Sequence, residues 1–414
     1  MSTPQDTPHD TPRQGPLAPY KVLEIGSTIA GPFCGRLFAD FGAEVVKVEA
    51  LEGDPVRSMG HHVDGHSLYA ASILRNKANA AIDLRTEAGR ALVRSLAAQA
   101  DVLIENFRPG TLEKWDLSYE RLRADNQGLV LVRISGYGQT GPYAGRPGYG
   151  VISEAMSGLR SVTGDADRPP ARMNTSLTDY LTGLYAAFGA LAALDHRQRT
   201  GEGQVVDAAL YECGFSLMEP HVGAYAHRGV VAQRTGSALP GSVPNNLYAT
   251  ADGRHLHIAA MADAVFRRLC GAIGQPQLVE DPRFAAAAAR VGQAPALDAV
   301  VGAWTASRTL DEAEAALRAA DVPAARIYSV ADAFADPHYA ARGTVVHAPA
   351  PQLPQLPQGV AMANVVPRLS ATPGAVRHAG RARGEDTRAV LARWLGLDAA
   401  AIDQLGADGA VQLA

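Results

Sequence analysis

Strand-like and helix-like segments alternate along residues 20–135, and this alternation constrains the fold more than any other feature of the chain. The strand-like runs are rich in Val, Ile and Leu and lie at 20–26, 44–49, 80–84, 101–105 and 129–135. Helical patterns separate them at 32–41, 86–99 and 119–126. Continuous apolar runs of this length are typical of strands buried on both faces. The pattern therefore predicts an α/β, Rossmann-like domain with a largely parallel sheet and helices on both faces.

The composition of the chain changes near residue 229, where a turn-rich segment begins. We expect a smaller α+β domain over 229–330. The Pro/Gln-rich stretch 347–358 is predicted to be an extended connector, and 386–397 an amphipathic helix. Residues 331–414 should then return to the large domain begun by 19–228, after a disordered tail over 1–18.

Charge and cysteine content exclude several classes of protein. The 414 residues are 47% hydrophobic with a net charge of −4 and no basic stripe, so we expect no nucleic-acid partner. No run approaches the roughly 18 apolar residues of a membrane span, and the polar N-terminus does not resemble a signal peptide. The three cysteines show no paired spacing, which favours a reducing cytoplasm. His61, His62 and His66 have no accompanying ligand cluster, so no metal is expected.

Three glycine-containing motifs follow predicted strands at their carboxyl ends, where open parallel sheets place their ligands. They are Gly26–Pro32, Ile104–Gly110 and Ser135–Pro142. Each is also compatible with a purely structural turn. The first lies between a strand and a helix, where backbone N–H groups favour anions, but it is neither GxGxxG nor a P-loop.

Lysine is scarce in this arginine-rich chain, with only Lys21, Lys47, Lys77 and Lys114 present. Lys77 in the run Leu74-Arg-Asn-Lys77 could be retained for contact with a phosphate. The alternative is an ordinary solvated charge.

Asp179 lies where a small-residue loop enters an apolar helix that ends near Thr200, before Gly201. An aspartate at such a position is commonly a helix cap. A carboxylate held there could also be a nucleophile.

Taken together and in order, these motifs resemble the class III CoA-transferases, the CaiB/BaiF family to which formyl-CoA transferase belongs. The resemblance runs from about Tyr20 to Leu397 and rests on the following segments: Ala30-Gly-Pro32, Gly42–Glu49, Asn76-Lys77, Glu105–Gly110, Ser135–Pro142, Asp179 and Thr200–Gln204. It implies that Asp179 is the nucleophile and that two chains form an interlocked homodimer. It also implies a large domain made from both ends of each chain.

The chemistry that the resemblance implies uses coenzyme A and acyl-CoA as substrates, without a permanently bound cofactor, ATP or metal. Asp179 would attack a thioester to give an anhydride and then an aspartyl-CoA thioester, which a second carboxylic acid converts to a new acyl-CoA. Backbone N–H groups near Asp179 would stabilise the oxyanions, and a lid over 236–244 would exclude water. Positions that match the CoA channel of the family are Thr28, Ile29, Lys77, Asn106, Phe107, Lys114, Gly136 and Tyr137.

The chain departs from the family pattern at two places that bear on phosphate anchoring. Ala50 stands where some relatives have an arginine, and Gly384-Glu-Asp-Thr387 lacks a histidine often found there. The lid segment also has fewer consecutive glycines. The segments Arg234-Thr-Gly236 and Pro244–Tyr248 resemble relatives that use succinyl-CoA with dicarboxylic or hydroxy-dicarboxylic acids.

Three other functions compete with this assignment. An α-methylacyl-CoA racemase needs a second acid/base group, and Tyr149 replaces the histidine of that group. A nicotinamide-dependent oxidoreductase would use Glu49 to bind a ribose, but the glycine fingerprint is absent. A protein that binds CoA without catalysing a reaction is the third alternative, and the presence of Asp179 makes it unnecessary.

Overall fold

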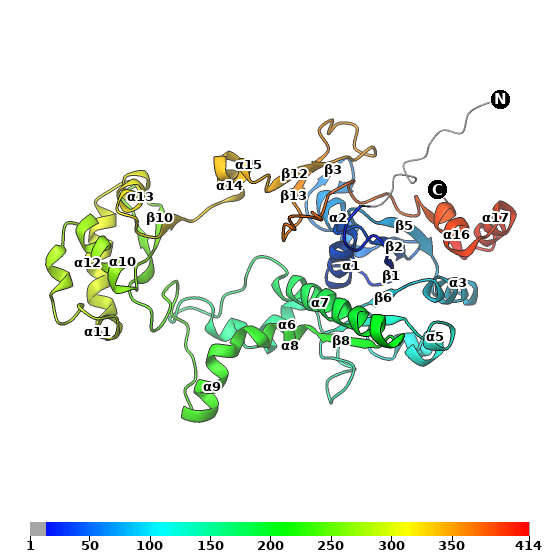
Figure 1. The fold of residues 1–414 in the computed structure, drawn as a ribbon, viewed down its shortest axis with the longest axis horizontal. Helices are drawn as coiled ribbons and strands as arrows, with labels where there is room; N and C mark the ends of the chain where they lie inside the picture. Colours follow the sequence, from blue (N-terminus) through cyan, green and yellow to red (C-terminus); the bar gives the residue numbers. More distant parts are fainter. Residues whose placement is uncertain (1–13, 414) are drawn as a thin grey trace. The chain divides into compact units, whose positions relative to one another are not determined.

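The computed structural model describes residues 14–413, and these residues form two compact units (Figure 1). The first contains the chain up to Leu159, Met173–Gly223 and the chain from Ala341 onward. The second contains Ala224–Ala340 and, in addition, Arg160–Arg172. The sequence did not suggest that this short earlier segment leaves the first unit. Of the expected tail, residues 1–13 lie outside the described part, and Leu17 donates its N–H to the Phe41 carbonyl at 3.0 Å.

A seven-stranded sheet forms the centre of the first unit, in the order β14-β5-β2-β1-β6-β7-β8. Its strands are β1 (Lys21–Glu24), β2 (Glu44–Glu49), β5 (Ala78–Ile82), β6 (Val102–Glu105), β7 (Val130–Ser135), β8 (Val205–Ala209) and β14 (Val411–Gln412). Six strands are parallel to their neighbours, as predicted. Strand β14 departs from this, because Val411 pairs antiparallel with Ile82 of β5. The C-terminus therefore completes one edge of a sheet begun by the N-terminal half.

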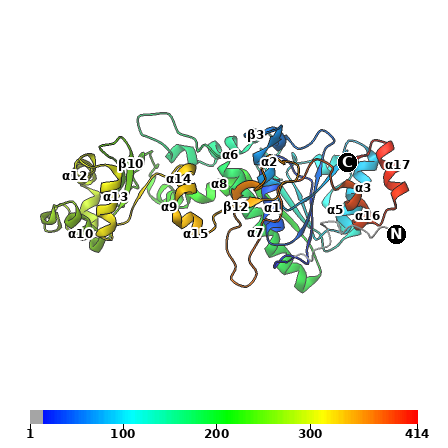
Figure 2. The same ribbon diagram turned by 90° about the horizontal axis from the view of Figure 1, so that it is seen from above.

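Helices cover both faces of this sheet, and two separate cores result (Figures 1 and 2). Helices α1 (Ala30–Asp40) and α7 (Leu177–Thr200) pack on one face. Helices α3 (Glu87–Ala98), α5 (Tyr119–Asp125), α16 (Thr387–Leu395) and α17 (Ala399–Ala407) pack on the other. Successive residues of one strand point to opposite faces, so Val22 of β1 belongs to the α1 core and Leu23 to the α3 core. The residues of the central strands are nearly all buried, as expected for a sheet that is covered on both faces.

Local sequence accounts for several helix ends. Thr86 caps α3 by accepting the Gly89 N–H, as expected. Helix α7 ends at Gly201, whose φ of 77° is a conformation that glycine adopts without strain. The expectation that no run approaches a membrane span is wrong for α7, which among the described residues is long and apolar enough to cross a membrane by length and composition alone. Its contacts with α1 and the sheet show one face of it buried in a protein core.

Buried polar contacts fasten the C-terminal return to the first unit. The Arg75 guanidinium donates to Asp40 at 2.6 and 2.9 Å and to the Ala363 carbonyl. Asn76 donates to Asp40 and Ala375 and accepts the N–H of Arg377 at 2.7 Å. The Pro/Gln-rich stretch is not an extended connector, because the strands that flank it, β12 (Val345–Ala348) and β13 (Val360–Ala363), pair as an antiparallel hairpin. Its prolines and glutamines form the turns of the hairpin loop.

Shorter elements complete the first unit. These are β3 (His62–Val63), β4 (His66–Ser67), α2 (Leu68–Ile73), α4 (Thr111–Lys114), α6 (Gly150–Met156) and α8 (Leu210–Phe215), with short 3₁₀ turns at Pro55–Ser58 and Ser216–Met218. Another 3₁₀ turn, Leu159–Val162, lies where the chain passes from the first unit to the second. Helix α9 (Glu219–Arg228) leads into the second unit.

The second unit is a small α+β domain. Its antiparallel sheet, in the order β11-β10-β9, consists of β9 (Asn245–Ala249), β10 (His255–Ala259) and β11 (Ala324–Arg326). Its helices are α10 (Asp263–Ala272), α11 (Ala287–Val291), α12 (Ala294–Ala306), α13 (Leu310–Ala319), α14 (Val330–Ala335) and α15 (Pro337–Ala341), with a 3₁₀ turn at Pro276–Val279. Arg234 holds the segment 160–172 in this unit by donating to the carbonyls of Asp165, Ala166 and Arg168.

Candidate functional site

The sheet reverses its strand order between β1 and β6, and this defines a crevice at the carboxyl ends of the strands. The chain leaves β1 toward β2 on one side, whereas β6 lies on the other side and continues to β7. The turn 26–29 after β1 and the loop 106–110 after β6 therefore diverge at this point. Open α/β sheets bind ligands at such switch points.

Asn106 ties the two sides of the switch point together. Its side-chain oxygen accepts the Ser27 N–H at 2.7 Å, and its amide nitrogen donates to the Ser27 carbonyl at 2.8 Å. A Cβ on Gly26 would lie 2.7 Å from this oxygen, so only glycine fits there. The Gly26 N–H donates to the Ile104 carbonyl, and the Thr28 N–H donates to Asp54. These three N–H groups are therefore already bonded within the protein. The prediction that the segment 26–32 favours an anion then concerns the later N–H groups, at the start of α1.

Asp179 lies in the first turn of α7 but does not cap the helix. Ser176 occupies the cap position, and Asp179 is the third helical residue. A Cβ on Gly150 would lie only 1.9 Å from the Asp179 Oδ2 atom. The neighbouring Thr178 hydroxyl donates to the Gly150 carbonyl at 2.8 Å. The start of α6 and the start of α7 therefore fit together around this carboxylate, and Asp179 is not the N-cap residue that the capping alternative required.

Burial raises the pKa of the Asp179 carboxyl to about 6, although a hydrogen bond from its own backbone N–H opposes the shift. Its surroundings are aromatic: Tyr180 donates to the Tyr69 hydroxyl at 2.9 Å and packs edge-on against Phe33. Burial and the bond from Tyr180 raise the pKa of Tyr69 above its usual range, and the charge of Asp179 adds to this. A poorly solvated carboxylate of this kind is more nucleophilic than one in water.

Gly136 and Tyr137 lie in the loop after β7, close to the chain that enters α6. A Cβ on Gly136 would approach the Gly148 Cα to 2.9 Å, so the two backbones meet directly. The Tyr137 ring contacts the rings of Tyr143 and Tyr211, with centroids 6.0 and 6.3 Å away. Gly136 thus contacts the chain two residues before Gly150, the residue that lies against Asp179.

Phe107 and Lys114 follow β6. The Phe107 ring packs edge-on against Trp115 at 5.1 Å and remains half-buried. The Phe107 N–H donates to Glu105 at 2.7 Å, which fixes the start of the loop. Lys114 is exposed at the end of α4. Both remain available to a ligand at the crevice.

Two predicted contact residues, Lys77 and Ile29, are instead buried structural groups. The Lys77 ammonium is 1% exposed and donates to Glu24 and to the Pro32 carbonyl, both at 2.6 Å. It pairs internally and does not reach a phosphate, so the expectation from lysine scarcity is corrected. The Ile29 side chain is 4% exposed in a small apolar cluster with Val56 and Ile73.

Three residues that sequence reasoning did not assign help to build the site. Gly150 leaves room for the Asp179 carboxylate, and Lys47 and Asp54 support the turn after β1. Lys47 lies among valines in a strand predicted to be buried, and a charge there signals a buried partner. Asp54 and Gly150 gave no comparable signal, because their roles arise only in three dimensions.

Glu49 cannot serve as the ribose-binding acid of an oxidoreductase. Its carboxylate accepts from Arg57 at 2.7 and 2.8 Å, from Asn79, and from the Asp54 N–H at 2.9 Å. Within residues 14–413 no three His, Cys, Asp or Glu side chains are grouped to hold a metal ion.

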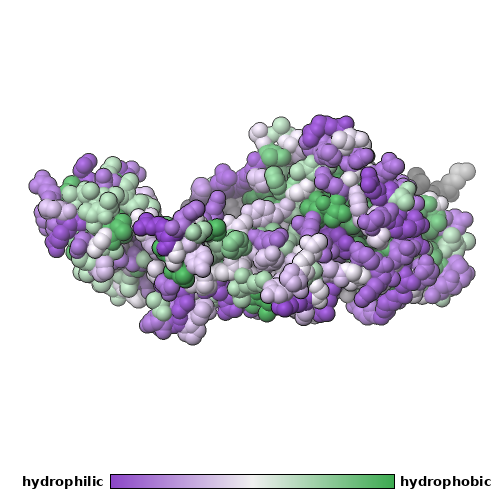
Figure 3. Space-filling model, turned by 90° about the horizontal axis from the view of Figure 1, so that it is seen from below, coloured by the Kyte–Doolittle hydropathy of each residue, from purple (hydrophilic) through white to green (hydrophobic). Residues whose placement is uncertain are grey.

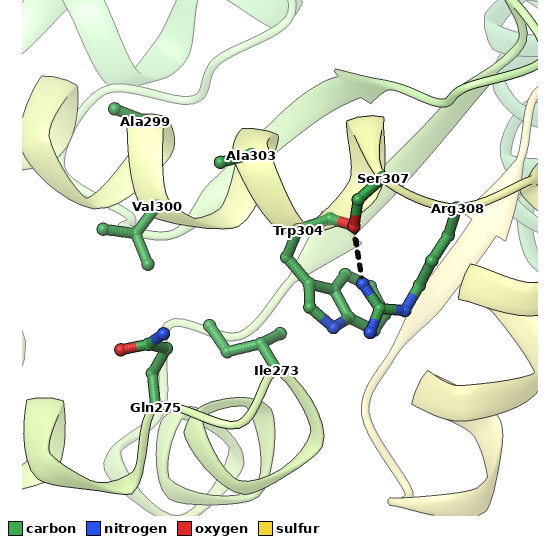
Figure 4. Close-up of a pocket in the computed structure, with 8 residues that line it drawn as sticks. All are labelled: Ile273, Gln275, Ala299, Val300, Ala303, Trp304, Ser307 and Arg308. Carbon is green, nitrogen blue, oxygen red and sulfur yellow. Dashed lines mark hydrogen bonds between the residues drawn. The ribbon is translucent and has the colours of Figure 1, made fainter.

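A separate groove of about 520 Å³ lies in the second unit between α12 and the residues after α10 (Figure 4). Its lining is mainly aliphatic, and its one cation, Arg308, stacks on Trp304 and donates to Ser307 at 2.7 Å. It offers no nucleophile or acid/base pair for acyl transfer.

The parallel sheet, the switch-point crevice and the half-buried carboxylate are together typical of an α/β enzyme with a candidate nucleophile. The chain belongs to CoA-transferase family III, whose family model matches residues 17–387. Enzymes of this family transfer coenzyme A, and the confirmed resemblance covers nearly the whole chain.

Curated relatives narrow the comparison. The chain is 48% identical to a succinyl-CoA–D-citramalate CoA-transferase of Chloroflexus aurantiacus, over 92% of this chain and 94% of the relative. It is 38% identical to a succinate–glutarate CoA-transferase of Agrobacterium fabrum, over 80% and 84%. A crystal structure of a CaiB/BaiF family protein from Brucella suis is similar with a TM-score of 0.82 at 37% identity, covering 92% of this chain and all of that one.

Proposed function

We propose that this protein transfers coenzyme A from succinyl-CoA to a small dicarboxylic or hydroxy-dicarboxylic acid, with Asp179 as the nucleophile. The observation that carries the role of Asp179 is its half-buried carboxylate, seated against Gly150 at the start of α6. The names of the relatives support the substrates, since they act with succinyl-CoA on citramalate or exchange succinate with glutarate.

The proposed reaction conserves the thioester through four substitutions. An Asp179 oxygen attacks the carbonyl carbon of succinyl-CoA and the C–S bond breaks. The products are a mixed anhydride of Asp179 with succinate and free CoA thiolate. The thiolate attacks the aspartyl carbonyl, which gives an aspartyl-CoA thioester and succinate. An acceptor carboxylate attacks the carbonyl carbon of this thioester, which releases CoA thiolate and forms a second anhydride. The thiolate then attacks the acceptor's carbonyl carbon in that anhydride. The new acyl-CoA departs and the Asp179 carboxylate is regenerated.

Residues around the switch point are proposed to hold coenzyme A. Thr28 and Asn106 shape the crevice, Phe107 offers a flat ring for the adenine, and Lys114 supplies an exposed cation for phosphate. Gly136 and Tyr137 would border the path toward Asp179. Lys77 and the Ile29 side chain are left out because they are buried.

We also propose that the chain acts as an interlocked homodimer in the cytoplasm. Exposed apolar side chains on α7, namely Leu184, Phe188 and Leu191, support a subunit contact. Its three cysteines, Cys34, Cys213 and Cys270, are free thiols, which suits a reducing compartment.

The test is substitution of the nucleophile. Purified Asp179→Asn enzyme should lose CoA transfer from succinyl-CoA to citramalate by at least about a thousandfold, because the amide cannot form the anhydride. A matched control is Asp195→Asn, an exposed aspartate on the same helix paired with Arg199, which should retain transfer. Hydroxylamine added to the wild-type enzyme with succinyl-CoA should yield a hydroxamate at Asp179, detected by peptide mass spectrometry. Transfer that survives in Asp179→Asn would exclude the assignment.

The racemase alternative is tested with the same protein. Tyr149 is 74% exposed beside Gly150, so this position does not supply a second buried acid/base group. We expect no exchange of the α-proton of a 2-methylacyl-CoA in deuterated water.

A further inference from the structure

Thr28 has an unusual backbone conformation at the crevice. Its φ is 71°, in the left-handed region that β-branched residues rarely occupy. It lies in the turn between β1 and α1, so its conformation decides how the chain turns at the switch point. Such an outlier persists only where surrounding contacts hold it.

Asp54 holds this turn from a buried position. One carboxylate oxygen, Oδ1, accepts the N–H of Thr28 at 2.9 Å and the N–H of Val56 at 2.9 Å. The other oxygen lies 2.8 Å from the Lys47 ammonium. Asp54 is 5% exposed and Lys47 is 1% exposed, so solvent screens this ion pair little.

Lys47 contacts the same turn from β2. Its ammonium donates to the Gly26 carbonyl as well as pairing with Asp54, and a second carboxylate, Glu24, lies 3.7 Å away. The ion pair thus bonds to the turn twice, at Gly26 and at Thr28. Asn106 bonds to Ser27 between them.

We propose that the buried Lys47–Asp54 pair is a positioning device that holds Thr28 in its left-handed conformation, so that acyl-CoA meets a preformed turn. Neither side chain touches the reacting atoms. The pair acts through the backbone of residues 26–28. When the pair is lost, Thr28 relaxes to negative φ, and the shape of the crevice changes. This inference rests on the proposed function, because it assigns the ligand of the turn to coenzyme A.

The proposal predicts a specific coupling between positions 54 and 28. In the protein that keeps the wild-type Thr28, Asp54→Ala should weaken binding of free CoA about tenfold, since the left-handed conformation of Thr28 loses its support. In the Thr28→Gly background the same substitution should weaken binding about threefold or less, because glycine enters the left-handed region at little cost. A purely structural role for Asp54 predicts equal losses in both backgrounds.

The experiment is a double-mutant cycle measured by calorimetric titration with free CoA, accompanied by the KM for succinyl-CoA and the kcat at saturation. We expect KM to rise with the dissociation constant while kcat changes less than about threefold. If Asp54→Ala does not fold, Asp54→Asn in both backgrounds takes its place, because it loses the ion pair with Lys47 and weakens the support of the Thr28 N–H. Its loss of CoA binding should again be larger with Thr28 than with glycine at position 28. Equal losses in both backgrounds, or unchanged CoA binding in Asp54→Ala, would overturn the positioning role. A wild-type protein that does not bind CoA would remove the proposed function and this inference together.

Discussion

At the residue scale, the environment of a single carboxylate distinguishes Asp179 from the other acidic residues at helix starts. Glu87 and Asp311 are in the first turns of their helices, and their exposed carboxylates bond to Arg90 and Arg326. Asp179 instead faces the backbone of Gly150 and aromatic side chains. Carboxylates at similar helical positions therefore differ in pKa and reactivity, because the degree of desolvation, and not the position in the helix, sets these properties.

Gly150 provides the most direct test of this packing. Gly150→Ala would place a Cβ 1.9 Å from the Asp179 Oδ2 atom, so we expect the carboxylate to be displaced and transfer to fall about a hundredfold. Gly271→Ala is the matched control, because Gly271 also lies in a helix and a Cβ there meets nothing within 4 Å. That control should retain transfer and gain up to about 1 kcal/mol of stability. Full activity in Gly150→Ala would mean that the carboxylate can move without loss.

The raised pKa of Asp179 predicts a pH dependence in activity and stability. The nucleophile must be ionised, so kcat/KM for succinyl-CoA should fall tenfold per pH unit below about pH 6. Because this pKa lies above the ordinary value of 3.8, the folded protein binds more protons between pH 4 and 6 than the unfolded chain. The contribution of Asp179 to stability is therefore lost as the pH rises through about 6.

Thermal unfolding measures the same effect without turnover. At pH 7.5 the Asp179→Asn protein should unfold at a higher temperature than the wild type, and the difference should shrink toward pH 4. A difference that does not vary between pH 4 and 7.5 would contradict an elevated pKa.

At the element scale, the run Arg75-Asn-Lys77 shows how internal bonding redirects charged residues. All three side chains are buried, and they connect α1, β1 and the C-terminal return. Gly35 makes part of this possible, because a Cβ there would lie 1.9 Å from the Glu24 carboxylate that pairs with Lys77. The motif therefore joins both ends of the chain into one unit.

Removing Arg75 should separate these elements. Arg75→Met leaves the Asp40 carboxylate buried without its bidentate partner, so we expect a loss of about 3 to 5 kcal/mol in the free energy of unfolding, measured by urea denaturation. The control Arg85→Met breaks a pair whose arginine side chain is 65% exposed and should change stability by less than about 1 kcal/mol. Equal effects of the two substitutions would show that the return segment docks through its apolar contacts alone.

The strands and their order of appearance were predictable because each is a short apolar run bounded by turn residues. The predicted span of β2, 44–49, agrees with the structure, and the others differ by one or two residues at their ends. The antiparallel β14 was not predictable, because two paired residues, Val411 and Gln412, carry no periodic signal. Charged residues were the least predictable, since Lys77 depends on Glu24 of a distant strand and Lys47 on Asp54, a loop residue that only the folded chain brings to it.

At the scale of the whole molecule, helix α7 combines two roles. One face contributes Ala186, Ala190 and Leu194 to the core beside the sheet. Apolar side chains on other parts of its surface are exposed, with Phe188 at 71% and Leu184 at 55%. Apolar residues also reach the molecular surface in several patches on the face shown in Figure 3. A helix that is apolar nearly all round is normally buried on all sides, which is why we assign this surface to the proposed subunit contact.

Phe188→Glu tests that assignment. A charge in an apolar subunit contact would be desolvated without a partner, so we expect the wild type to elute as a dimer and the variant to shift toward monomer in size-exclusion chromatography with light scattering. Ser95→Glu, on the exposed side of α3, is the control for added charge and should remain dimeric. Because Phe188 lies more than two helical turns beyond Asp179 on α7, any loss of transfer in the variant would follow from loss of the second subunit and not from direct contact with the nucleophile. A wild-type protein that is monomeric at micromolar concentration, or a variant that remains dimeric, would place the subunit contact elsewhere or exclude it.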